Sequence, residues 1–184
     1  MNVRVRTKKL VMIAMFIAII FAQEEALTGI PNVQLTVLLL MVYGAVVGPI
    51  WGSVIVLAHC LFDNLFMGSL MPSVFLPMAI GWEIVMLFGW FSKKWPIILK
   101  VIMSILGALI YCWLFVLFNW LMIPTIDIYK YMIADIPFEI VLMASSGISV
   151  ALLYIPIYKI ADKGYNFDRI KSDKIETNEE EPLL

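Results

Sequence analysis

The chain has 184 residues, of which 62% are hydrophobic and 15% are charged, and its mean hydropathy is +0.95. Soluble domains are about 45–50% apolar, so this composition excludes an ordinary soluble globular domain. The formal net charge of −1 gives no indication of a nucleic-acid partner, and none is expected.

Six apolar stretches follow one another along the chain, and we expect each to form a membrane-spanning helix. A span needs about 20 residues, and backbone amides in hydrocarbon must be hydrogen-bonded within their own helix. Gly48-Pro49 predicts a tight turn between the second and third stretches. The stretches are 10–22, 33–48, 51–67, 74–91, 97–123 and 138–160.

The basic residues predict the orientation of this six-helix bundle. With six spans, all of the 13 Lys and Arg residues except Lys130 fall on one face of the membrane. Basic residues are concentrated on the cytoplasmic side, so both termini are predicted to be cytoplasmic. The sequence therefore predicts an all-α integral membrane protein, with a six-helix membrane domain at 1–161 and a polar, disordered cytoplasmic tail at 162–184.

Catalytic and cofactor motifs are absent from the sequence. There is no Walker A loop, no GxGxxG, no HExxH and no CxxC, so no cofactor is expected. No metal site is expected either, because His59 is the only histidine and no ligand set has the usual spacing. Cys60 and Cys112 lie within apolar stretches and are interpreted as buried small apolar residues.

A stripe of small residues occurs in the first stretch. Ala14, Ala18 and Ala22 are four residues apart and therefore share one face of a helix, where another helix could approach closely. The stripe either packs within this chain or serves as a docking surface for a separate membrane subunit.

Polar and aromatic residues gather toward the outer ends of the later stretches. The segment that follows the first stretch contains Asn32 and Gln34 and is either an ordinary exposed loop or the wall of a site that opens outward. A carboxylate within a span is costly and usually has a partner, so a polar residue in a span either fixes packing or lines a ligand pocket. The residues of this kind are His59, Asp63, Asn64, Trp82, Glu83, Trp113 and Asn119.

In several features the sequence resembles the substrate-binding S component of energy-coupling factor (ECF) vitamin transporters. The resemblance covers residues 5–160 and includes the small size, six helices with cytoplasmic termini and Ala14-x-x-x-Ala18. It also includes the Gly48-Pro49-Ile50-Trp51-Gly52 turn, and the segment Ile30-Pro31-Asn32-Val33-Gln34 is similar to the cobalamin-type members.

The resemblance implies a role in the uptake of a vitamin across a bacterial plasma membrane. An S component captures its vitamin outside, docks on a transmembrane coupling subunit and topples when two ATPase subunits hydrolyse ATP. Ala14, Ala18 and Ala22 would form the docking stripe. Cobalamin or a related corrinoid is the first expected ligand, while pyridoxine, another B vitamin or a queuosine precursor remain open.

Three other functions were weighed from the sequence. A stand-alone channel or carrier could use Asp63 and Glu83, although the chain is short and shows no internal repeat. An intramembrane hydrolase with His59 as a base lacks a GxSxG signature, so the chain is not expected to be an enzyme. The third is an assembly factor in which the polar residues only fix packing.

Overall fold

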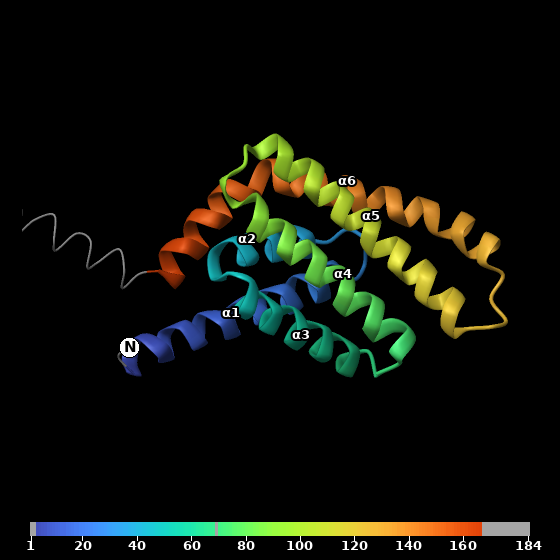
Figure 1. Ribbon diagram of the computed structural model, residues 1–184, viewed down its shortest axis with the longest axis horizontal. Helices are drawn as coiled ribbons and strands as arrows, with labels where there is room; N and C mark the ends of the chain where they lie inside the picture. Colours follow the sequence, from blue (N-terminus) through green and yellow to red (C-terminus); the bar gives the residue numbers. More distant parts are fainter. Residues whose placement is uncertain (1–2, 69, 167–184) are drawn as a thin grey trace, which may run out of the picture.

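The computed structural model describes residues 3–68 and 70–166, which fold into α-helices joined by short connections (Figure 1). The all-α prediction is confirmed for these residues. The helices are α1 (Val3–Leu27), α2 (Thr36–Val47), α3 (Pro49–Phe66), α4 (Pro72–Phe91), the short 3-10 helix η1 (Ser92–Lys94), α5 (Ile97–Met122) and α6 (Ile128–Tyr165). The predicted tail lies outside the described residues from 167 onward, and residues 162–165 belong to α6.

Five of these helices, α1, α3, α4, α5 and α6, are long and apolar enough to cross a membrane. Large apolar side chains are exposed along all five, for example Met15, Leu61, Ile80, Leu106 and Leu152. In water such a surface would be unfavourable, whereas lipid tails are as apolar as these side chains. The described part thus has the character of a multi-pass helical membrane protein.

The second helix differs from the prediction in length. The stretch 33–48 was expected to span, but α2 has 12 residues and is about 18 Å long, compared with about 30 Å of hydrocarbon. Residues 36–46 are all buried, and α2 contacts α1, α3, α4, α5 and α6. A helix that is apolar on every side belongs in a protein interior. Here α2 forms the centre of the bundle, surrounded by longer helices.

Two glycines allow α2 and α4 to approach with their backbones in contact. A Cβ atom at Gly44 would lie 2.2 Å from the Met86 carbonyl oxygen, and one at Gly89 would lie 2.1 Å from the Met41 carbonyl oxygen. Close crossings of this kind are typical of small residues in membrane helices. The position of α2 therefore depends on these two glycines.

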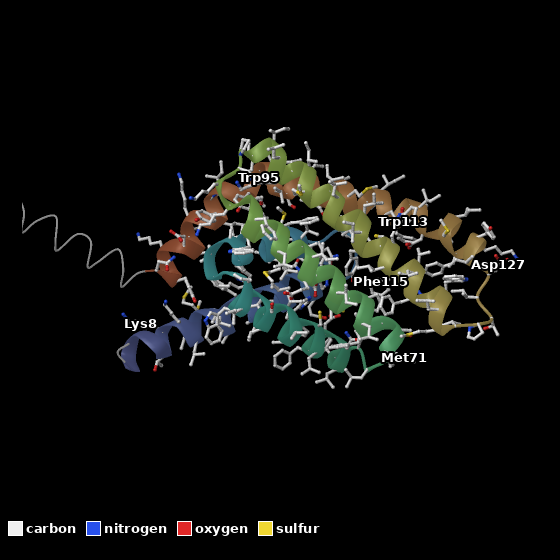
Figure 2. All side chains as sticks on the ribbon, viewed as in Figure 1. Lys8, Met71, Trp95, Trp113, Phe115 and Asp127 are labelled. Carbon is white, nitrogen blue, oxygen red and sulfur yellow. The ribbon has the colours of Figure 1, made fainter. Side chains whose placement is uncertain are left out.

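The connections alternate between two ends of the bundle. Lys8 and Trp95 lie toward one end, and Met71 and Asp127 lie toward the other (Figure 2). At the first end α1 meets the end of α6, where the Lys9 ammonium lies 5.1 Å from the centre of the Tyr165 ring. We call the first end, which also carries Lys93 and Lys94 of η1, the basic end. Because the connections alternate, the start of α1 and the end of α6 lie at the same end of the bundle, as an even number of crossings requires. The cytoplasmic location of that end remains a prediction.

Replacing Gly89 with alanine should destabilise the fold, because its Cβ cannot be accommodated without separating the α2 and α4 backbones. We expect a loss of about 1–3 kcal/mol, seen as a lower midpoint of thermal unfolding in detergent. Gly29→Ala is the matched control, since a Cβ there meets nothing within 4 Å. Equal stability of the two variants would contradict the close-approach interpretation.

Candidate functional site

Two adjoining cavities lie at the end of the bundle opposite the basic end. The first has a volume of about 200 Å³ and the second about 210 Å³, and both are bordered by Asn32 and Tyr111. The first cavity is enclosed by most of residues 27–34 and by Glu24, Glu25, Asp63, Met67, Met78, Trp82 and Tyr111. The second is enclosed by Asn32, Tyr111, Cys112, Phe115, Tyr131, Asp135 and Leu142.

The wall contributed by the α1–α2 connection is held by a hydrogen-bond network around Thr36. Gln23 Nε2 donates to Thr36 Oγ1 at 2.7 Å, and the Leu35 amide donates to Gln23 Oε1 at 2.8 Å. The Thr36 hydroxyl has one proton and donates it to Glu24 Oε1 at 2.5 Å in preference to Gln34 Oε1 at 3.3 Å. The last turn of α1 is thereby fastened to the first turn of α2.

Asn32 occupies a special position in this wall. Its φ of 58° lies in the left-handed region, which asparagine tolerates better than most residues. Its carbonyl oxygen lies 3.2 Å from Ser145 Oγ of α6, whose one proton is shared between this oxygen and the Leu142 carbonyl oxygen at 3.1 Å. The connection is therefore attached to α6 as well as to α1, and Asn32 borders both cavities.

An aromatic pair forms the inner wall of the first cavity. The rings of Trp82 and Tyr111 stack with their centres 3.9 Å apart. Gly81 permits this approach, because a Cβ there would lie 2.7 Å from the Tyr111 ring. Trp82 is 1% exposed, and its indole N–H has no hydrogen-bond partner among the described residues. A buried indole donor normally has an acceptor, and this one has none in the described part of the chain although Trp82 lines the cavity.

Three carboxylates belong to the first cavity, and they differ in their partners. Glu24 accepts from Thr36 and lies 3.5 Å from Nε2 of the fully buried His59. The side chains of Glu25 and Asp63 have no hydrogen bond or ion pair within the described part of the chain. The structure thus places His59 beside Glu24 of α1, while Asp63, four residues later on α3, forms no ion pair with it.

The residues predicted for the site fall into three groups. Those that line the first cavity are Asn32, Gln34, Asp63 and Trp82. His59 and Asn64 are buried on α3 without lining it. Asn64 Nδ2 donates to the Cys60 carbonyl oxygen at 2.8 Å and contacts Sδ of Met78, which does line the cavity.

The other predicted residues lie away from both cavities. Glu83 accepts a hydrogen bond from Ser53 at 2.5 Å and borders a separate crevice on the surface of α3 and α4. Trp113 is 54% exposed on α5. Asn119 donates to the hydroxyl of Tyr131, which lines the second cavity. Their roles in binding remain predictions.

Several lining residues were not among the predicted site residues. Glu24, Glu25 and Tyr111 line the first cavity without having been predicted for the site. The two glutamates follow an apolar stretch and precede a polar connection, and this position in the sequence could have predicted that they line the site. Tyr111, Tyr131 and Asp135 gave no comparable signal, because their convergence depends on how α5 and α6 pack.

A group of potential metal ligands adjoins the second cavity. Cys112, Asp135 and Glu139 each offer a ligand atom, and these atoms lie within 4.8 Å of one another. Structural zinc sites usually have four such ligands, so three provide an incomplete set. The expectation that this chain uses no metal is not tested by this geometry.

The alanine stripe of α1 is exposed at Ala14, Ala18 and Ala22. Ala14 and Ala18 line an apolar groove of about 620 Å³ between α1 and α3. Within the described residues, the small faces of these alanines are therefore directed outward and are not used for packing inside the bundle. The other residues of the groove are Ile17, Phe21, Phe62, Leu65 and Phe66.

Comparison with known proteins gives no further assignment: no family model, no curated protein and no solved structure matches this chain.

Replacing Thr36 with valine should loosen the connection that walls the cavity. The change keeps the shape of the side chain but removes the hydroxyl that bonds Gln23 and Glu24. We expect a loss of about 1–3 kcal/mol and faster amide hydrogen exchange in residues 28–35. Thr36→Ser retains the hydroxyl and should exchange like the parent protein. Exchange unchanged by the valine would show that the network does not hold the connection.

Proposed function

We propose that this chain is the substrate-capturing membrane subunit of an ECF-type importer in a bacterial plasma membrane. It binds a vitamin from the outside and delivers it when docked on an ATP-driven module. The observation that carries the proposal is that α1 presents two different surfaces. Its outer end supplies Glu24 and Glu25 to a partly open polar cavity, while its middle exposes Ala14 and Ala18 in an apolar groove.

The two surfaces support a division of labour between this chain and its partners. The cavity is partly open and lies at the end opposite the basic end, which the positive-inside rule makes the external side. The alanine groove is apolar and open along the bundle, as a site for a helix of a transmembrane coupling subunit requires. The chain has no nucleotide-binding motif, so two separate ATPase subunits would supply the energy for toppling.

The size of the cavities bears on the choice of vitamin. Pockets for drug-sized ligands usually measure about 300–1,000 Å³, whereas the two cavities measure about 200 and 210 Å³. Their volumes support one of the smaller vitamins over a corrinoid, although cobalamin was the first prediction from the sequence. A stand-alone carrier using Asp63 and Glu83 has less support, because these residues border different hollows.

Tryptophan at Ala14 or Ala18 should prevent docking and leave the binding site intact. The large side chain would fill the groove that the proposal assigns to the coupling subunit, while the cavity lies at the outer end of α1. The measurement is the amount of ATPase subunit that co-purifies with the tagged chain from its native membrane. We expect at least about a tenfold decrease, which corresponds to about 1.4 kcal/mol of docking free energy.

Ala151→Trp is the matched control, because Ala151 is an exposed alanine of α6 that lies outside the groove. It should retain the partner subunits. Loss of the partners in all three variants, or in none, would count against the alanine groove as the docking surface. Failure of the parent chain to co-purify with any ATPase would contradict the proposed function itself.

A further inference from the structure

The charged side chains that line the two cavities are all acidic. Glu24, Glu25 and Asp63 line the first cavity, and Asp135 lines the second. No Lys or Arg lines either cavity among the described residues. Lys130, the one basic residue predicted for this end, is exposed and pairs with Asp127 at 3.1 Å. An anionic ligand would meet uncompensated repulsion here, whereas a cation would be attracted.

Two of these carboxylates lack the hydrogen-bonding or ion-pair partner that a partly buried carboxylate usually has. Glu25 and Asp63 are partly buried near the ends of apolar helices, yet their side chains form no hydrogen bond or ion pair in the described part of the chain. Ionisable groups in such segments usually pair with another group or with a ligand. An ammonium group offers three N–H donors and a positive charge, so one such group could donate a hydrogen bond to each carboxylate and balance negative charge.

The remaining walls have the features of a site for a ring. Trp82 and Tyr111 present stacked aromatic side chains, and Met67 and Met78 add polarisable apolar surface. Aromatic faces attract organic cations and also stack with flat rings.

We infer that the first cavity selects a small organic cation, an amine carried on an aromatic or heteroaromatic ring. This inference rests on the proposed function for its premise that the cavity takes up a ligand, and it specifies the class of that ligand. Asp63 and Glu25 bind the ammonium group, and the ring lies against the wall formed by Trp82 and Tyr111. The cavity volume of about 200 Å³ fits one ring with short substituents.

The test compares ligands that share a ring and differ in charge. Pyridoxamine, pyridoxine and 4-pyridoxic acid carry an aminomethyl, a hydroxymethyl and a carboxylate group at the same ring position. Thiamine and histamine extend the panel of ring cations, and cyanocobalamin represents the corrinoids. Binding to the full-length protein in detergent is measured by thermal shift and calorimetry. We expect a ring amine to bind, pyridoxamine to bind at least about tenfold more tightly than pyridoxine, and the acid not to bind.

Asp63→Asn removes the charge and keeps the shape of the side chain. It should weaken binding of the amine by at least about tenfold and leave the affinity for a neutral ligand within about twofold. Asp127→Asn is the matched control, because Asp127 lies at the same end, borders neither cavity and caps α6. An asparagine still caps a helix, so this variant should bind like the parent protein.

The outcomes separate this inference from the proposed function. If no ring amine binds at millimolar concentration, or if cyanocobalamin, the acid or a divalent metal ion binds in place of the amines, the inference is overturned. Co-purification with ATPase subunits would still support the proposed function in that case. If ring amines bind with the expected dependence on Asp63 but no ATPase associates with the chain, the ligand class stands and the importer role fails.

Discussion

The contact between the α2 and α4 backbones is the constraint on which the rest of the structure depends. Gly44 and Gly89 leave no room for a side chain, so the two helices approach closely and α2 is enclosed on all sides. Because α2 is enclosed, it does not need the length of a membrane span. The α1–α2 connection lies directly before its first turn and lines the first cavity.

Thr36 links this central helix to the candidate site. It is fully buried at the first turn of α2, and its hydroxyl joins Gln23 and Glu24 at the end of α1. Burying a hydroxyl in an apolar bundle costs free energy unless the hydroxyl is hydrogen-bonded. The Thr36 hydroxyl accepts one hydrogen bond from Gln23 and donates one to Glu24. The same bonds that satisfy Thr36 fix the orientation of the wall that carries Asn32 and Gln34. Packing of the core and shape of the cavity are therefore coupled.

The two ends of the bundle differ in electrostatic character. The basic end carries Lys9, Lys93, Lys94 and Lys100, and the Lys100 ammonium donates to the carbonyl oxygens of Lys93 and Trp95. The opposite end carries the carboxylates that line the cavities. The first arrangement orients a protein in a membrane, and the second sets the sign of charge that a bound ligand can carry. Both follow from the distribution of charge, although the net charge of the chain is only −1.

The sequence by itself determined the helical class, the order of the apolar helices and the separation of basic from acidic residues. These properties are local, because hydrophobicity and charge can be read residue by residue along the chain. Only the tertiary structure decided that α2 is a short buried helix and that His59 lies beside Glu24. It also decided that Asp63 faces the cavity while Glu83 bonds Ser53 elsewhere. These outcomes depend on the rotation and crossing of whole helices, which are set by contacts between residues far apart in the chain.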